Sequence, residues 1–249
     1  MCNPPARTFL ILLFACLTLI APTRQLSAQS APDFSGVWIL DLDRTDDVRD
    51  MYGEIRVIRQ TEKQISLTMV DYGAAFVDGA YRKVVRLVPW TFRFGRWGPR
   101  RGPADSKQPR TRAEWSGQHL VLAKSTFSGN GEFVWVWDRS DRTLTHIETR
   151  KTWDNDFQAR PAEGIQTYFL STHANDPALL SLGAKLKTDI VVNVTEDISA
   201  IQVQCPTQNC TVVILDNGTR VGSRPLPKGQ MMTLPLESEV IIQPGDTSK

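Results

Sequence analysis

Cations and aromatic rings that could bind an anion are concentrated in one stretch of this chain. Residues 82–112 hold ten Lys or Arg against the single acid Asp105, a net charge of +9, while the rest of the chain after residue 28 carries −9. Trp90, Phe92, Phe94 and Trp97 are interleaved with these cations. Arginine beside aromatic rings binds anions through bidentate contacts and cation–π stacking. The alternative is that the rings are core and the arginines a solvated rim paired with the chain's own acids.

Tryptophans could also line an apolar cavity, because small-molecule sites are mostly apolar and aromatic. All seven Trp lie between Trp38 and Trp153, and no Phe, Trp or Tyr follows Phe169. A barrel interior filled by its own side chains is the alternative. Together with the cations, this gives the candidate ligand-binding residues Trp38, Trp90, Arg93, Arg96, Trp97, Arg100, Arg101, Trp135 and Trp137.

No catalytic or metal signature is found in the sequence. The histidines His119, His146 and His173 have no metal-ligand spacing, and there is no Gly-x-Ser-x-Gly, His-Glu-x-x-His or phosphate-binding glycine loop. The acidic run Asp41 to Asp50 lacks the glycine and terminal Glu of an EF-hand, so we expect a solvated turn paired with Arg44 and Arg49. We expect no enzyme, no metal and no cofactor; an enzyme hypothesis would need His119 and His146 to meet across paired strands.

The first 28 residues are typical of an export signal. The apolar run from Phe9 to Ala21 is shorter than the about 20 residues that span a membrane, and Ala28 suits a signal-peptidase site. Lipid anchoring through Cys16 is the alternative. We expect a periplasmic or secreted protein with no transmembrane segment in the mature chain and no nucleic-acid partner. In an oxidising compartment, the remaining pair Cys205 and Cys210 predicts one disulfide.

The elements that must position these residues are predicted to be β-strands, because apolar and polar residues alternate with a period of two. Short polar breaks, such as Asp78-Gly79 and Ser116-Gly117, predict hairpin turns. The pattern favours an up-and-down barrel or a sandwich. The expected strands of the first half are 34–40, 55–59, 65–69, 74–77, 80–88, 110–115, 119–127, 132–137 and 142–151.

The second half of the chain restarts this alternation without aromatic residues. Its expected strands are 190–194, 198–204, 211–215, 219–223, 230–236 and 239–243, with a hairpin turn at Asp216-Asn217-Gly218. Because every large ring lies in one half, we predict two domains: a barrel over 29–153 and a small β-sandwich-like module over 188–249, in which the disulfide clips a hairpin loop. Residues 154–187 are a predicted connector with a short helix at 177–183.

A family resemblance supports the barrel. Phe34-Ser35-Gly36-Val37-Trp38 resembles the Gly-x-Trp opening of lipocalin-like (calycin-type) barrels, and residues 33–43 together with 114–122 resemble exported bacterial lipocalin-like proteins. The resemblance covers about residues 33–151. It implies an all-β, antiparallel up-and-down barrel in which Trp38 packs across one end and the interior holds an apolar ligand, and it transfers no catalytic residue. The basic stretch and the C-terminal module depart from it.

Two functions follow as expectations. The first is a non-enzymatic extracytoplasmic protein that binds an apolar or amphipathic, anionic ligand. The second is a cell-envelope structural or adaptor protein, which uses residues 82–112 and the C-terminal module to hold a polyanion or a protein partner.

Overall fold

The fold is all-β and antiparallel, as predicted. The computed structural model describes residues 31–45, 53–77, 80–98, 109–125, 131–152, 165–170 and 190–245, and all elements among them are strands. The predicted signal segment, the helix at 177–183, the Asp78-Gly79 turn, Arg100 and Arg101 lie outside the described residues.

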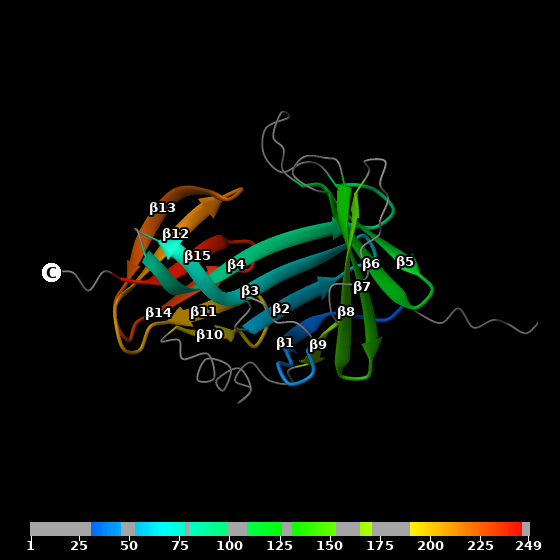
Figure 1. Ribbon diagram of the computed structural model, residues 1–249. Coiled ribbons are helices and arrows are strands. Elements are labelled where there is room, and N and C mark those ends of the chain that lie inside the picture. The colour runs from blue at the N-terminus through cyan, green and yellow to red at the C-terminus, as the bar shows by residue number, and fades with distance from the viewer. Residues whose placement is uncertain are drawn as a thin grey trace, which may run out of the picture. The chain divides into compact units, whose positions relative to one another are not determined.

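Nine strands of the larger sheet form the barrel (Figure 1). Their spatial order is β4-β3-β2-β1-β9-β8-β7-β6-β5. β9 comes from within the range expected to be a connector and pairs with both β1 and β8. The strands are β1 (Gly36–Leu40), β2 (Gly53–Gln60), β3 (Gln64–Val77), β4 (Ala80–Arg93), β5 (Thr111–Ser116), β6 (His119–Ser125), β7 (Gly131–Ser140), β8 (Thr143–Thr152) and β9 (Ile165–Leu170).

The barrel is closed where β5 meets the end of β4. A parallel bridge joins Phe94 to Ala113, the Gly95 N–H donates to the Ala113 carbonyl at 3.1 Å, and the Gly98 N–H donates to the Thr111 carbonyl at 2.7 Å. We call this junction the seam. It is formed by described residues of the basic stretch 82–112, which therefore contribute to the barrel wall.

The hairpin of β3 and β4 is longer than the sequence indicated. A break was expected between 69 and 74 and an end at 88, yet the two strands pair without interruption from Gln64↔Arg93 to Val77↔Ala80. Val70 and Tyr72 are buried on the same face of β3, and their burial stabilises the strand on either side of the polar Asp71. Trp90 and Arg93, which lie beyond the expected end of the strand at 88, are consequently strand residues.

The C-terminal strands form two sheets. β13, β12 and β15 extend the larger sheet, since β15 pairs with β4 through Val240↔Leu87 and Ile242↔Val85, while β10, β11 and β14 form a separate sheet. The predicted turn at Asn217-Gly218 is confirmed, with φ values of 50° and 79°. The strands are β10 (Val191–Val194), β11 (Ala200–Gln204), β12 (Cys210–Asp216), β13 (Thr219–Leu226), β14 (Met231–Pro235) and β15 (Glu239–Pro244).

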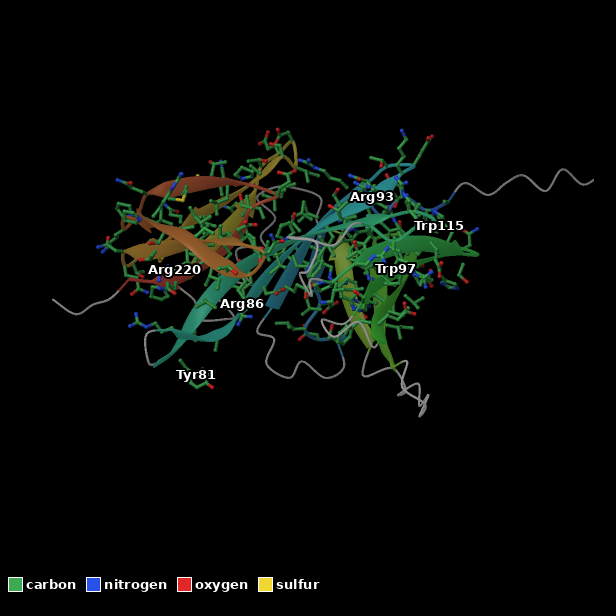
Figure 2. All side chains as sticks on the ribbon, turned by 90° about the horizontal axis from the view of Figure 1, so that it is seen from above. Tyr81, Arg86, Arg93, Trp97, Trp115 and Arg220 are labelled. Carbon is green, nitrogen blue, oxygen red and sulfur yellow. A yellow bond between two sulfur atoms is a disulfide. The ribbon has the colours of Figure 1, made fainter. Side chains whose placement is uncertain are left out.

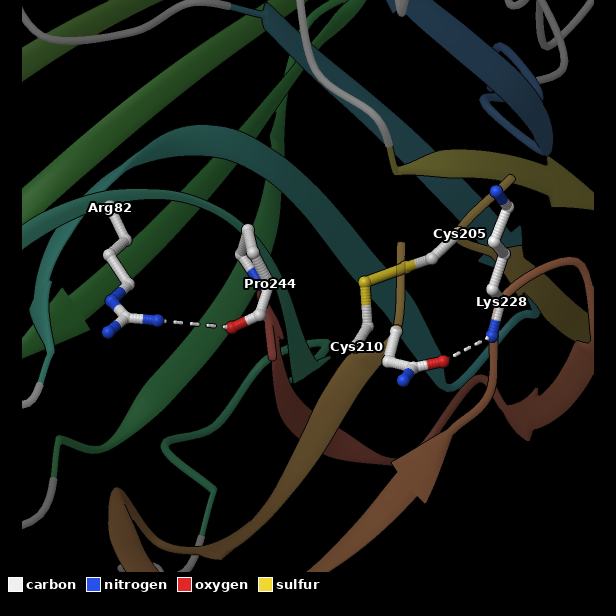
Figure 3. The surroundings of a disulfide bond; sticks show 6 residues. Arg82, Cys205, Cys210, Lys228 and Pro244 are labelled. Carbon is white, nitrogen blue, oxygen red and sulfur yellow. Dashed lines mark hydrogen bonds between the residues drawn. A yellow bond between two sulfur atoms is a disulfide. The ribbon is translucent and has the colours of Figure 1, made fainter. Parts of the chain in front are cut away.

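The Cys205–Cys210 disulfide is present as predicted, but its role differs (Figure 3). β11 and β12 do not pair with each other; they belong to different sheets. The expectation of a clipped hairpin loop is therefore wrong. The bond ties the end of β11 to the start of β12 where the chain crosses between sheets, and both sulfur-bearing residues are buried.

Two cores lie on opposite faces of β1–β4. The aromatic core fills the barrel side and includes Phe34, Trp38, Phe92, Trp135 and Trp137. The aliphatic core lies on the outer side, where Val37, Val57, Val70 and Leu87 of the barrel strands join residues of β10–β15 such as Val203 and Val240. The ring-free C-terminal strands thus share their core with the outer face of the barrel.

Candidate ligand-binding site

One end of the barrel interior is densely packed with rings. Trp38, Phe92 and Trp137 have 0% of their surface exposed, so no water-sized space touches them. The Trp38 Nε1–H donates to the Phe34 carbonyl at 2.8 Å, and the Phe34 ring lies 6.0 Å from Trp137 and 6.2 Å from Trp115. Phe34 and Trp38 therefore plug this end.

A ring-lined lysine occupies the other part of the aromatic interior. Lys124 follows Leu120 and Leu122 on the inward face of β6, because those two leucines belong to the aromatic core. Its Nζ lies 4.6 Å from the centre of the Trp90 ring, 5.3 Å from Phe133 and 5.7 Å from Trp135. Lys124, Trp90 and Phe133 are half-buried, so solvent reaches this place. We call Lys124 and the three residues whose rings surround it, Trp90, Phe133 and Trp135, the lysine cage.

A buried polar cluster lies behind the cage. The Arg56 guanidinium donates to Glu54 and, at 2.6 Å, to His146 Nδ1, and it sits 5.3 Å from the Trp137 ring. Since a guanidinium only donates, Nδ1 must accept, which places the imidazole hydrogen on Nε2. Burial, followed by the Arg56 charge, holds the pKa of His146 well below its usual value, so the ring is neutral.

Asp71 extends this cluster on the neighbouring strand. It lies directly opposite Glu54 in the β2–β3 register. Burial, followed by the Glu54 charge, raises the pKa of Asp71 to about 7, although Arg56 and Arg86 act in the opposite direction. No hydrogen-bond partner among the described residues reaches Asp71 Oδ1. The Asp71 carboxyl therefore keeps its proton at pH values where an exposed aspartate has lost it.

Two indole donors face the same interior. The Nε1 atoms of Trp135 and Trp137 are buried and have no hydrogen-bond partner among the described residues. Both rings lie next to His146, with centroids 5.8 Å and 6.3 Å away. Buried indole N–H groups usually find an acceptor. The Trp135 ring, which lines the lysine cage, thus carries a buried donor that has no acceptor among the described residues.

The predicted site residues fall into separate groups. Trp90 and Trp135 meet at the lysine cage, whereas Trp38 and Trp137 lie in the packed interior. Arg93 and Arg96 are exposed, and Trp97 lies on the outer side of the seam. The structure does not bring these arginines to the interior rings.

The interior charges were missed by sequence reasoning. Lys124 follows Leu120 and Leu122 on the inward face of β6, and Arg56 lies between Glu54 and Ile58 on the inward face of β2. A charged residue at an inward position of a strand was the available signal.

The histidines and the acidic run do not form a reactive site among the described residues. His119 is exposed, 3.7 Å from Asp138, while His146 is buried inside the barrel, so the two do not meet. Asp41 lies 3.9 Å from Arg44, as expected for a solvated turn. No group of His, Cys, Asp or Glu suited to a metal ion occurs in the described part of the chain.

A pocket with an empty volume of about 330 Å³, open solvent included, lies on the outer side of β3 and β4. Arg59, Thr91, Leu236 and Glu237 are among its lining residues. Thr68 Oγ1 donates to the Leu236 carbonyl at 2.8 Å there, so the pocket marks the contact between the barrel and the β14–β15 turn.

Comparison with solved structures gives a likeness to a fluorescent protein. Crystal structures of the fluorescent protein UnaG, as wild type and as two single-residue variants, match with TM-scores of 0.34 to 0.35 and identities of 13% to 14%. The matches cover 55% to 56% of this chain and 97% of UnaG. No protein-family profile and no curated protein matches the sequence. Over the described ranges, no helix has the length and apolar character needed to cross a membrane.

Proposed function

We propose that this protein binds a small amphipathic ligand with a negatively charged group, and that the lysine cage is its site. The observation that carries the proposal is the Lys124 ammonium inside the barrel, within 5.7 Å of the Trp90, Phe133 and Trp135 ring centres. The rings supply apolar contact area and the ammonium supplies the charge that an anionic group needs.

The neighbouring groups support the same ligand chemistry. The Trp135 ring, which lines the cage, also carries a buried N–H that has no acceptor among the described residues. The packed rings at Trp38, Phe92 and Trp137 leave no room at the plugged end. A ligand therefore binds at the half-buried cage, with its charged group at Lys124 and its apolar part against Trp90 and Phe133.

The proposed role is binding without chemical conversion, outside the cytoplasm. His146 accepts from Arg56 through Nδ1 and is neutral, which makes it part of the barrel's internal hydrogen bonding. Export is supported by the apolar segment before Ala28 and by the Cys205–Cys210 disulfide. Mass spectrometry of the protein from its native host gives the mature N-terminus. A start after residue 28 supports export with removal of the signal segment, whereas a lipid-modified N-terminal Cys16 would show that the protein is a lipid-anchored protein.

The test is a titration followed by tryptophan fluorescence. Dodecanoate, dodecanol and dodecyltrimethylammonium share one chain and differ in charge. We expect wild-type protein to bind dodecanoate best, and Lys124→Met to weaken dodecanoate binding at least about tenfold, or 1.4 kcal/mol, while dodecanol binding stays unchanged.

The matched control is Lys63→Met, which removes an exposed lysine from the β2–β3 turn. It should leave all three affinities as in wild type, and circular dichroism should show both variants folded. A wild-type protein that binds none of the three amphiphiles, or a Lys124→Met variant with unchanged preference for dodecanoate, contradicts the proposal.

An adaptor function is the second candidate, and β13 favours it. This edge strand of the larger sheet is exposed at nearly every position up to Pro225, with Val221 at 61%. An unpaired edge is a template for an added strand. Replacing Val221 by Pro, which removes a backbone donor, should abolish retention of a partner from envelope extract if β13 is the contact, and leave the lysine cage intact.

A further inference from the structure

The outer side of the barrel seam presents cations that the fold does not neutralise. Phe92 and Phe94 point inward, so Arg93 between them points outward. Arg112 lies on the outer side of β5, and Arg110, directly before β5, lies on the same side. The chain crosses between the two strands at Gly95–Gly98, which brings Arg96 and Trp97 to the same place. We define the seam surface as Arg93, Arg96, Trp97, Arg110 and Arg112; Figure 2 labels Arg93 and Trp97 on it.

The five residues differ in how their charges are balanced. Arg112 lies 3.0 Å from Glu114 and 3.8 Å from Glu132, so it is paired. Arg93, Arg96 and Arg110 are exposed, and no acidic side chain within the described ranges comes within 4.0 Å of them. The Arg110 Nε–H donates to the Gly98 carbonyl at 3.3 Å, so an outside anion can bind the Arg110 Nη groups and the guanidinium groups of Arg93 and Arg96.

The seam surface is held in place by the backbone. Besides the hydrogen bonds that close the barrel, the Arg110 N–H donates to Ser125 Oγ at 2.8 Å, and the Ser125 N–H donates to the Arg110 carbonyl at 2.9 Å. The Trp97 ring lies 5.0 Å from the Arg112 guanidinium and 5.9 Å from that of Arg110. These contacts hold the Arg110 guanidinium in place, and a side chain that is already fixed loses less freedom when an anion binds, which favours affinity.

We propose that the seam surface binds a polyanionic polysaccharide, through sulfate or phosphate groups on the Arg93, Arg96 and Arg110 guanidinium groups. Guanidinium matches these anions bidentately. A folded protein partner fits less well, because the centre of a protein interface is usually apolar and poor in charged residues, whereas four of the five residues of the seam surface are arginines. None of the large exposed hydrophobic residues among the described ones, Tyr81, Val221 and Met231, belongs to this surface.

The test uses dextran sulfate, with uncharged dextran as the matched polymer. We expect wild-type protein to bind dextran sulfate and not dextran. The triple variant Arg93→Gln, Arg96→Gln, Arg110→Gln should bind dextran sulfate at least about tenfold more weakly. In a plot of log affinity against log salt concentration, its slope should be smaller in magnitude than that of wild type by about 2, on the order of 0.7 for each lost contact.

The control variant Arg220→Gln, Arg224→Gln, Lys228→Gln removes the same charge from exposed positions of β13 and the following turn. It should bind dextran sulfate within about twofold of wild type. Equal loss in both triple variants, or no loss in the seam variant, overturns the proposal, because binding then follows net charge alone or another surface. Binding of poly-glutamate but not of dextran sulfate overturns it in favour of an acidic polypeptide. Dodecanoate binding is measured on the same variants. Because it tests the lysine cage and dextran sulfate binding tests the seam surface, a failure of one proposal can be told from a failure of the other.

Discussion

Arg56 shows how a charged residue is tolerated inside this barrel. Its guanidinium is almost fully buried but donates to Glu54 and His146 and lies over the Trp137 ring. A buried ion pair adds little to stability compared with an apolar pair, yet the loss of one partner leaves a buried charge behind. The same arrangement explains why His146 is neutral, since its Nδ1 must accept from Arg56.

We predict that Arg56→Met lowers the free energy of unfolding by about 3 kcal/mol or more, because Glu54 loses its guanidinium partner in the interior. Urea unfolding followed by tryptophan fluorescence measures the change. Arg220→Met, at an exposed position of β13, is the control and should change the free energy by less than about 0.5 kcal/mol. A loss as small as that of the control would mean that Arg56 is solvated in solution.

Asp71 gives a prediction about pH. The folded protein keeps the proton on Asp71 up to about pH 7, whereas the unfolded chain loses it near the usual pKa of 3.8. Between these values the folded state binds more protons, so this group makes the free energy of unfolding fall as pH rises. Asp71→Asn removes that fall.

His146 acts in the opposite direction over part of the same range, because its lowered pKa favours the unfolded state on acidification below 6.5. The measurement is therefore the difference in unfolding free energy between wild type and Asp71→Asn at pH 5 and at pH 8. We expect the variant to gain stability relative to wild type as pH rises from 5 to 8. An unchanged difference would place the Asp71 carboxyl in solvent.

At the scale of elements, β1 depends on its first residue. Gly36 has φ of +139°, and a Cβ there would lie 2.6 Å from Leu170 Cδ1 of β9. The backbone of β1 approaches β9 closely at this position, which lets Trp38 pair opposite Leu170 and reach across the plugged end. The glycine of the Gly-x-Trp opening is thus explained by backbone conformation and by the space next to Leu170.

We predict that Gly36→Ala destabilises the protein by about 1–3 kcal/mol, since it adds both backbone strain and a clash. Thermal unfolding checks this. Gly117→Ala provides the comparison, because Gly117 also has positive φ, of 63°, but nothing lies within 4 Å of its Cβ position. The Gly36 variant should therefore be the less stable of the two, and equal stability would show that Leu170 moves aside at no cost.

For the whole molecule, the aliphatic core couples the stability of the barrel strands β1–β4 to that of the C-terminal strands β10–β15. Contacts group Pro32–Lys249 into one compact unit. Val37, Ile55, Val70 and Leu87 are buried on the outer face of β1–β4 against residues of β10–β15. Removal of the C-terminal strands would expose this face to water, and a contiguous apolar patch of that kind promotes aggregation.

We predict that the chain ending at residue 189 does not fold to a stable barrel, and that the full-length protein unfolds in a single transition. All seven tryptophans precede residue 154, so fluorescence reports the barrel, whereas far-UV circular dichroism reports every strand. Coincident urea transitions are expected from the two signals. Two separated transitions, or a folded truncated chain, would show that the barrel is stable without its C-terminal partner.

The all-β class, most strand positions, the Asn217-Gly218 turn, the Cys205–Cys210 bond and the burial of Trp38 could be predicted from the sequence. These features depend on local signals: alternation, turn residues, cysteine pairing and a short motif. Three features became evident only in the folded chain: β9 inserts between β1 and β8, the C-terminal strands share a core with β1–β4, and Lys124 meets Trp90. Alternation tells which residues share a face, but both faces of β1–β4 are apolar, and what covers each face depends on contacts between residues far apart in the chain.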